Sequence, residues 1–267
     1  MAAKQTKRGA RPVAVVTGGL QGLGLGIAEA MRAGGFDLAI VDLSEEAVLP
    51  DALTAPGTGP GISRYYRMDI ADLASHDRVL AEIEADFGRL DCLVNNAGIA
   101  ARPLTDILEL MPDAFDRSVD VNLRGTFFLT QCFARRLIAS GPAEPRAYRS
   151  IIVITSIAAE LSFTDRSQYC LTKSALSMAT KLFAARLASE GIHVHEVRPG
   201  LMKTPMTAKV GSDTIEKLLA DGAVPIRRWG LPEDVGQTVC SLASGALPYM
   251  TGQAIWTAGG LNIPRIL

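Results

Sequence analysis

Short apolar runs alternate along this chain with segments in which apolar residues recur every three or four positions. A run such as residues 12–17 fits a strand buried on both faces, whereas the spacing in residues 22–33 is typical of a helix. This alternation predicts an α/β fold, in which helices cover both faces of a parallel sheet. The strands are expected at residues 12–17, 36–42, 62–68, 90–94, 150–155, 192–198 and 253–257. The helices are expected at residues 22–33, 72–87, 112–139, 165–189 and 232–244, with a short helix after Ser44 and another around 213–221.

No internal repeat or low-complexity linker divides the chain, so residues 11–267 are expected to form a single domain of three layers. Residues 1–10 are basic and polar, which predicts a flexible tail. Residues 201–230 interrupt the alternation before the last strand. An insertion at that point lies near the ligand crevice of such a sheet, so we expect it to act as a lid.

The first strand runs into a glycine-rich turn, Gly18-x-x-x-Gly22-x-Gly24, and a helix follows. Backbone N–H groups and the helix dipole make this helix N-terminus a site for anions, and the missing side chains let a pyrophosphate approach. Asp42 ends the second strand, where a carboxylate can accept hydrogen bonds from ribose hydroxyls. A tight turn that binds nothing is the alternative. Because strand, helix and Asp42 occur together, we expect a Rossmann-type, doubly wound sheet that binds a dinucleotide.

Polar residues and glycines follow most of the expected strands. In a doubly wound sheet the ligand lies beyond the carboxyl ends of the strands. The residues at these ends are Gly18, Asp42, Asp69, Asn95, Asn96, Ser156, Pro199 and Gly200. Periodicity alone therefore predicts that they gather along one edge of the sheet.

Tyr169 and Lys173 stand four residues apart in an expected helix, so their side chains share one face. A phenol has a pKa of about 10, and a fixed cation beside it favours phenolate and lowers that pKa. The hydroxyl of Ser156 can hydrogen-bond a substrate oxygen as its charge changes. This set of groups suits the movement of a proton on and off an alcohol or carbonyl oxygen.

These motifs together resemble the short-chain dehydrogenase/reductase family, in its single-domain branch. The resemblance spans residues 12–260, and within the branch it is nearest to proteins labelled 3-oxoacyl-[acyl-carrier-protein] reductase, a name applied loosely to many alcohol and sugar dehydrogenases. The motifs that carry it are Thr17-Gly18-x-x-x-Gly22-x-Gly24, Asn95-Asn96-Ala97-Gly98, Asn122, Ser156, Tyr169-x-x-x-Lys173 and Pro199-Gly200.

The resemblance implies a role for each catalytic residue. Tyr169 would be the general acid/base, Lys173 would lower its pKa and hold the nicotinamide ribose, and Ser156 would bind the reacting oxygen. Asn122 would hold a water that relays protons from Lys173; a helix residue that bonds only the local backbone is the alternative.

The same resemblance implies the residues that contact the cofactor and the substrate. The cofactor residues would be Gly18, Leu20, Gln21, Gly22, Leu23, Asp42, Leu43, Asp69, Ile70, Asn96, Ala97, Gly98, Tyr169, Lys173, Pro199, Gly200 and Thr204. The substrate residues would be Ser156, Ala158, Tyr169 and Met202, and Ala100, Arg102, Glu160, Leu161 and Met206 could also face the substrate. Arg102 and Glu160 could instead be solvated charges at the rim.

The expected cofactor is NAD(H). The carboxylate of Asp42 would face the 2′-phosphate of NADP at close range, and like charges there are costly. No cation compensates in the glycine loop, Gly19-Leu20-Gln21, or directly after the second strand, Leu43-Ser44.

Composition excludes several classes of partner. The 267 residues carry a formal net charge of −1, which implies no field that would attract nucleic acid or an anionic membrane. No apolar run approaches the roughly 18 residues that a spanning helix needs. The four cysteines are scattered without metal-ligand spacing, which predicts buried thiols in a reducing cytoplasm. His193 and His195 lack a third ligand, so we expect no metal site.

The sequence therefore predicts an NAD-dependent oxidoreductase that interconverts a secondary alcohol and its ketone. The alcohol would be a polyol, a sugar or a cyclic alcohol. Reduction of a 3-oxoacyl thioester is the alternative, and a non-catalytic nicotinamide-sensing regulator is a remote one. Apolar positions on several sides of helix 165–189, together with the apolar C-terminal stretch and the resemblance, predict a homotetramer.

Overall fold

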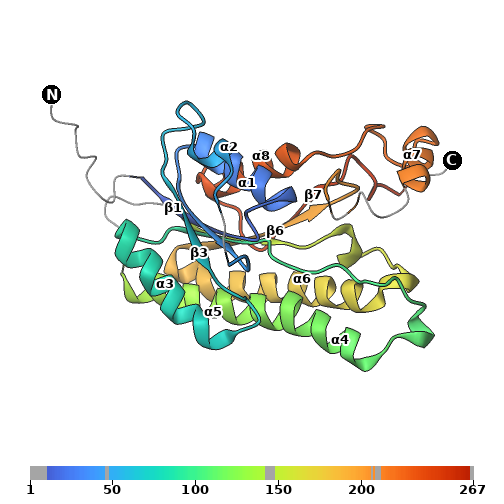
Figure 1. Ribbon diagram of the computed structural model, residues 1–267, viewed down its shortest axis with the longest axis horizontal. Coiled ribbons are helices and arrows are strands. Elements are labelled where there is room, and N and C mark those ends of the chain that lie inside the picture. The colour runs from blue at the N-terminus through green and yellow to red at the C-terminus, as the bar shows by residue number, and fades with distance from the viewer. Residues whose placement is uncertain (1–10, 46–47, 142–147, 206, 208–211, 265–267) are drawn as a thin grey trace.

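A seven-stranded parallel sheet forms the centre of the computed structural model, which describes residues 11–45, 48–141, 148–205, 207 and 212–264 (Figure 1). The strands are β1 (Val13–Thr17), β2 (Asp37–Asp42), β3 (Ser63–Arg67), β4 (Cys92–Asn95), β5 (Arg149–Ile154), β6 (Ile192–Pro199) and β7 (Ala254–Thr257). Their order in the sheet is β3-β2-β1-β4-β5-β6-β7, with every neighbouring pair parallel. The direction of winding reverses between β1 and β4, which is where a doubly wound sheet opens its crevice. The expected Rossmann-type α/β fold is confirmed.

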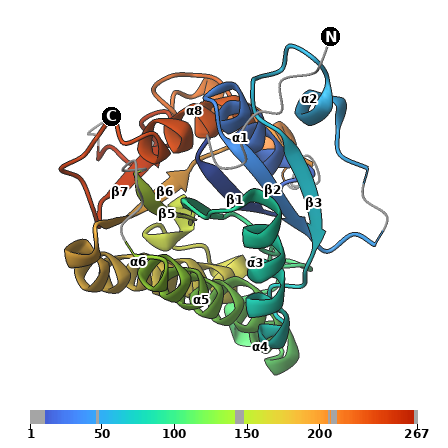
Figure 2. The ribbon, with the colours of Figure 1, turned by 90° about the vertical axis from the view of Figure 1, so that its left-hand side faces the viewer.

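Helices cover both faces of the sheet and complete three layers. They are α1 (Gly22–Ala33), α2 (Asp51–Thr54), α3 (Leu73–Phe87), α4 (Pro112–Ser118), α5 (Thr126–Ala139), α6 (Ser167–Leu187), α7 (Ser212–Ala220) and α8 (Pro232–Ala243). Figures 1 and 2 show α1 and α8 on one side of the sheet and α3, α5 and α6 on the other.

Two helices differ from the sequence-based expectation. The helix expected at 112–139 is interrupted by a π-helical turn, Val119–Gly125, between α4 and α5. Such turns widen the helix locally and occur often at functional sites. The short helix expected after Ser44 begins instead at Asp51, behind Pro50; residues 46–47 lie outside the described part of the chain.

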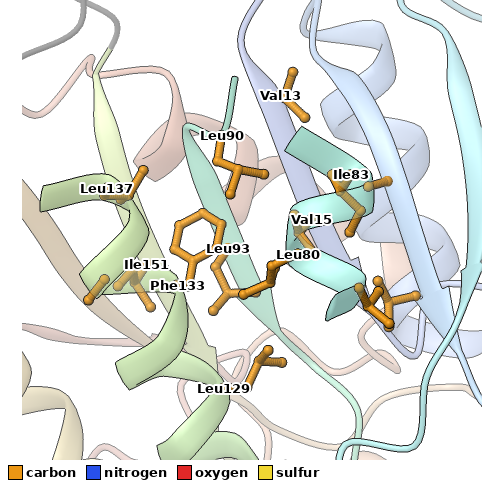
Figure 3. Packing of buried hydrophobic residues seen from close by; sticks show 14 of the residues in the cluster. Val13, Val15, Leu80, Ile83, Leu90, Leu93, Leu129, Phe133, Leu137 and Ile151 are labelled. Carbon is orange, nitrogen blue, oxygen red and sulfur yellow. The ribbon is translucent and has the colours of Figure 1, made fainter. Parts of the chain in front are cut away.

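The apolar strands are buried on both sides, which explains why their sequence is a continuous apolar run. In β1, Val13 and Val15 face the layer of α3 and α5, whereas Ala14 and Val16 face the layer of α1 and α8. Figure 3 shows the first of these cores, where Phe133 of α5 packs beside Leu93 of β4. The two cores fix the sheet rigidly, so its strand ends are held in place.

The segment expected to act as a lid contains α7, which packs on a small apolar cluster of its own. Ile215 and Leu219 of α7 are buried there with Val224, and Trp229 packs against them. Met206 and residues 208–211 of this segment lie outside the described residues, as does the tail at 1–10, so the lid and the tail stay predictions. Within the described residues, no helix combines the length and the apolar character needed to cross a membrane.

Candidate active site

The glycine-rich turn joins β1 to α1 with very close backbone packing. Gly18 has a φ of 66°, and its N–H donates to Val41 O at 2.7 Å. A Cβ on Gly18 would lie 3.0 Å from Asn96 Nδ2, and a Cβ on Gly24 would lie 2.0 Å from Gly18 O. Both positions therefore require glycine, because a side chain would push the helix away from the turn.

The N-terminus of α1 opens toward a cavity. Its N-cap residue, Gln21, makes no side-chain hydrogen bond to the helix, and the first turn carries no acidic residue. Gln21 and Gly22 line the cavity. The first-turn N–H groups, together with the helix dipole, suit a bound anion such as a pyrophosphate.

Asp42 is tied to the glycine turn from the end of β2. Its Oδ1 accepts from Leu43 N at 2.8 Å, and its Oδ2 lies 3.4 Å from Leu20 N. Asp42 and Leu43 both line the cavity. The carboxylate is thus held by the backbone of the glycine turn and lines the same cavity as the N-terminus of α1, and its contact with a ribose stays a prediction.

Thr17 joins the ends of β1 and β4. Its Oγ1 accepts from the N–H groups of Asn96 and Ala97, both at 3.0 Å, and donates to Val94 O at 3.2 Å. In addition, Asn96 Nδ2 donates a hydrogen bond to Thr17 O at 2.9 Å. The sequence analysis named Thr17 only as the first residue of the glycine motif. A hydroxyl side chain at the end of a buried strand was the signal that could have predicted its structural role.

One cavity of about 620 Å³ runs along this edge of the sheet. The predicted residues that line it are Gly18, Gln21, Gly22, Leu23, Asp42, Leu43, Asp69, Ile70, Asn96, Ala97, Gly98, Ala100, Arg102, Tyr169, Lys173 and Thr204. Gly24 of the glycine motif also lines it, and the lining residues that sequence reasoning did not single out are Val41, Met68, Ile99, Val121, Ile154, Thr155 and Pro205. Several of these directly precede a predicted strand-end residue, which was the signal that could have found them.

Asn122 sits in the π-helical turn and clamps the loop after β4. Its Oδ1 accepts from Ile99 N at 2.7 Å, and its Nδ2 donates to Ile99 O at 3.0 Å. A Cβ on Gly98 would lie 3.0 Å from Asn122 Oδ1 and 3.9 Å from Lys173 Nζ. The structure therefore brings Asn122 and Lys173 to the same side of Gly98, while the Asn122 amide itself is engaged with the loop backbone.

Tyr169 and Lys173 line one end of the cavity, and Ser156 contacts Tyr169 directly behind it. On α6, Lys173 Nζ lies 5.5 Å from the centre of the Tyr169 ring and donates to Ile154 O at 2.9 Å. Ser156 follows β5, hydrogen-bonds the Tyr169 side chain and accepts from Ala158 N at 3.1 Å. The three predicted groups therefore converge on a point where a reacting oxygen can be held.

Burial sets the proton affinities of this cluster. It raises the pKa of Tyr169, and the hydrogen bond from Ser156 acts in the opposite direction. It also lowers the pKa of Lys173 from its ordinary 10.5 to about 8, against the attraction of Glu196. Burial is the largest cause of the Tyr169 pKa shift, and the Lys173 ammonium group is turned to the carbonyl of Ile154; that Lys173 lowers the pKa of Tyr169 stays a prediction.

Several predicted residues lie off the cavity. Met202 is 3% exposed and packs into the core beneath α8, and it lines a separate cavity of about 280 Å³. Glu160 pairs with Arg198. The remaining residues that do not line the cavity are Leu20, Asn122, Ser156, Ala158, Leu161, Pro199 and Gly200. Met206 lies outside the described residues.

The histidines and cysteines are absent from the residues that line this cavity. His195 is fully buried and lies 3.3 Å from the Tyr148 hydroxyl through its Nε2. The four cysteines are unpaired. In the described ranges, no three His, Cys, Asp or Glu side chains are grouped to hold a metal ion.

Comparison with known proteins assigns the chain to one family. A family model described as enoyl-(acyl carrier protein) reductase matches residues 18–262. A relative from Dickeya dadantii, 2-dehydro-3-deoxy-D-gluconate 5-dehydrogenase, is 32% identical over 253 residues, which are 93% of this chain and 94% of the relative.

Two solved structures are similar along almost the whole chain. A 3-oxoacyl-[acyl-carrier protein] reductase from Brucella melitensis, in complex with NAD, is 42% identical, with a TM-score of 0.90 over 96% of this chain and 99% of the other. A gluconate 5-dehydrogenase from Burkholderia cenocepacia, in complex with NADP and tartrate, is 30% identical, with a TM-score of 0.85 over 95% and 96%.

The lowered pKa of Lys173 makes stability depend on pH. Between its folded pKa of about 8 and its unfolded value of 10.5, the unfolded chain binds more protons, so stability rises with pH in that window. Relative to Lys173→Met, the wild-type free energy of unfolding should gain about 2 kcal/mol between pH ~7.5 and pH ~10. Urea titrations of both proteins across this pH range measure the difference in the free energy of unfolding. A difference that stays constant with pH would show that Lys173 keeps an ordinary pKa.

Proposed function

This chain belongs to the short-chain dehydrogenase/reductase family of oxidoreductases that act on CH–OH groups, and we propose that it interconverts a secondary alcohol and its ketone with NAD(H). The alcohol is a polyol, a sugar or a cyclic alcohol. The observation that carries the proposal is that one continuous cavity joins Asp42, near the anion site, to Tyr169 and Lys173 at the reacting end.

The residues along the cavity fit a nicotinamide dinucleotide. Asp42 would accept from the adenosine ribose, and the uncapped N-terminus of α1 would bind the pyrophosphate. Lys173 would hold the second ribose, and Thr204 would hydrogen-bond the nicotinamide amide. The side chains missing at Gly18 and Gly22 leave the space that the phosphates need.

The protein's own groups manage the proton and the reacting oxygen. A nicotinamide held by these residues would supply the hydride chemistry. In oxidation, the Tyr169 oxygen takes the hydroxyl proton, and in reduction it returns a proton to the carbonyl oxygen. Ser156 donates a hydrogen bond to the same oxygen and so holds it against Tyr169. Both side chains are half-buried, so a bound cofactor and substrate would complete the exclusion of bulk water from this proton exchange.

The lining favours a small, polar substrate. Arg102 lines the cavity in the loop after Gly98, and this loop is pinned near Tyr169 because Thr105 N donates to Asp165 O at 2.9 Å. An arginine there suits hydroxyl or carboxylate oxygens, and two similar proteins are named for polyhydroxy acids. The name of the Brucella neighbour favours a 3-oxoacyl thioester as the second candidate.

A paired screen tests the substrate class. Polyols, sugar acids and secondary alcohols are run with NAD beside an acetoacetyl thioester with NADH and NADPH. We expect turnover with members of the first group, and Tyr169→Phe should lower it by at least about 10²-fold because the acid/base is removed. NADH binding, followed by fluorescence, should stay nearly unchanged. Tyr249→Phe, which removes the hydroxyl of a fully exposed ring, is the matched control.

Two results of this screen would contradict the proposal. Near-normal turnover in Tyr169→Phe would remove Tyr169 from the mechanism. Turnover of the thioester alone would replace the alcohol dehydrogenase with the thioester reductase.

The cofactor preference should depend on Asp42. Its carboxylate repels the 2′-phosphate of NADP, so we expect at least about tenfold higher kcat/KM with NAD, about 1.4 kcal/mol. Asp42→Ser should shrink this ratio, mostly by improving the use of NADP. Asp37→Ser, at the other end of β2, removes an equal charge and should leave the ratio unchanged. Faster ketone reduction with NADPH than with NADH by the wild type would sink the assignment.

We further propose that the protein is a homotetramer in the cytoplasm. Leu171, Met178 and Leu182 form a stripe along α6 and are 56%, 55% and 59% exposed. An apolar stripe of this kind is costly in water and suits a symmetric interface. The unpaired cysteines are consistent with a reducing compartment.

The apolar stripe on α6 offers a direct test of assembly. Light scattering of the wild type at micromolar concentration should give the mass of four chains. Leu182→Glu should shift the mass to smaller species, because a carboxylate would be buried in the interface. Gln237→Glu adds the same group to the exposed side of α8 and should leave the mass unchanged. A monomeric wild type would refute the tetramer.

A further inference from the structure

A buried ion pair lies directly behind the reacting end of the cavity. Glu196 and Arg198 stand two residues apart on β6 and are 1% and 6% exposed. Charged groups removed from water cost several kcal/mol unless they are paired and hydrogen-bonded. Their burial beside the candidate catalytic residues therefore calls for a functional explanation.

Glu196 is held by donors from three elements. Thr155, at the end of β5, donates to Glu196 Oε1 at 2.6 Å, and Ser177 of α6 donates to Oε2 at 2.7 Å. Arg198 Nε donates to Oε1 at 2.6 Å. Each carboxylate oxygen is thus fixed by at least one short hydrogen bond, so the charge cannot move.

The same donors are the immediate neighbours of the candidate catalytic groups. Thr155 lies between Ser156 and Ile154, whose carbonyl oxygen accepts from Lys173 Nζ at 2.9 Å. Ser177 lies one turn beyond Lys173 on α6. Glu196 therefore holds both segments that position the Lys173 side chain. One is the end of β5, whose Ile154 carbonyl accepts from Lys173, and the other is α6, which carries Lys173.

Arg198 holds the outer side of the pair. Its Nη2 donates to Ser177 Oγ at 2.7 Å, and its Nη1 donates to Glu160, in the loop after β5. The guanidinium carbon lies 4.9 Å from the centre of the Trp256 ring of β7. These contacts fix the position of Glu196 relative to the sheet.

The charges around Lys173 come from few elements. Tyr169 shares α6 with it, and Glu196 attracts it from β6. Arg198 is paired with Glu196 and Glu160 and hydrogen-bonds Ser177, one turn from Lys173 on α6. Two residues from the other packed elements, Thr155 directly after β5 and Asn122 of the π-helical turn, are neutral. Within the described residues, Glu196 is the charge that favours the protonated form of Lys173.

We propose that Glu196 is a positioning residue: it is the fixed counter-ion of Lys173, and it holds the Thr155–Ser156 strand end against α6. The first part concerns the chain alone, whereas the effect on catalysis rests on the proposed function. Without this carboxylate, the charge of Arg198, which hydrogen-bonds Ser177 one turn from Lys173, would be uncompensated, and the Lys173 ammonium group would lose its proton at lower pH.

A stability experiment without cofactor or substrate tests the counter-ion. The free energy of unfolding is measured by urea titration across pH for each variant and for the same variant carrying Lys173→Met. The difference between the two curves changes as folded Lys173 loses its proton, and the midpoint of that change is the readout. In the Glu196→Gln background this midpoint should fall by at least about half a pH unit. Ser177→Ala, which keeps the carboxylate and removes one donor, should leave it unchanged. An unchanged midpoint in Glu196→Gln overturns the proposal.

Two further variants keep the test decisive if Glu196→Gln does not fold. Glu196→Asp keeps the charge and should keep the midpoint near the wild-type value. Arg198→Gln removes the opposing cation, so the midpoint should rise. A midpoint that stays the same or falls in Arg198→Gln counts against the proposal.

The catalytic consequence is read separately from the pH profile. In Glu196→Gln, the rising limb of kcat/KM for alcohol oxidation should move to higher pH by at least about half a unit, because a neutral Lys173 no longer favours the Tyr169 phenolate. A purely structural role would lower the rate without moving this limb. If the wild type oxidises no alcohol, the proposed function fails while the stability result still decides the role of Glu196.

Discussion

Parallel hydrogen bonding between the strands is the constraint on which the rest of this structure depends. Because neighbouring strands run in the same direction, their carboxyl ends meet at one edge. Gly18, Asp42 and Asn96 follow or end three of these strands, and Ser156 follows a fourth. The sheet therefore assembles a cavity from segments that are far apart in the sequence, and the two apolar cores keep it rigid.

Close backbone packing makes the cofactor end of this edge. Gly24 lets α1 approach the turn at Gly18, and this approach directs the helix N-terminus at the cavity. Thr17 and Asn96 then lock the turn to β4 through both side chains. The anion site is thus built from backbone groups whose positions depend on missing side chains, so any side chain at Gly24 would displace the helix.

Removal from water is the main influence on the pKa values of Tyr169 and Lys173, at the reacting end of the cavity. Burial raises the pKa of Tyr169 and lowers that of Lys173, so each group is pushed toward its neutral form. The Glu196–Arg198 pair brings further charge into the same dry region, where each interaction is stronger than in water. Proton affinity at this end is therefore a property of the whole buried cluster, and neither Tyr169 nor Lys173 sets it alone.

The sequence by itself was sufficient to predict those features that depend only on residues close together in the chain. The strand–glycine–helix unit, Asp42 at a strand end and the Tyr169–Lys173 spacing all follow from periodicity and covalent geometry, and the fold they predict is the one observed. Tertiary structure alone decided which side chains meet across the sheet. It turned Met202 into the core, engaged Asn122 with Ile99 and placed Glu196 behind Lys173. It also decided the direction of the Tyr169 pKa shift, because desolvation depends on every atom packed around a group, and sequence spacing does not specify those atoms.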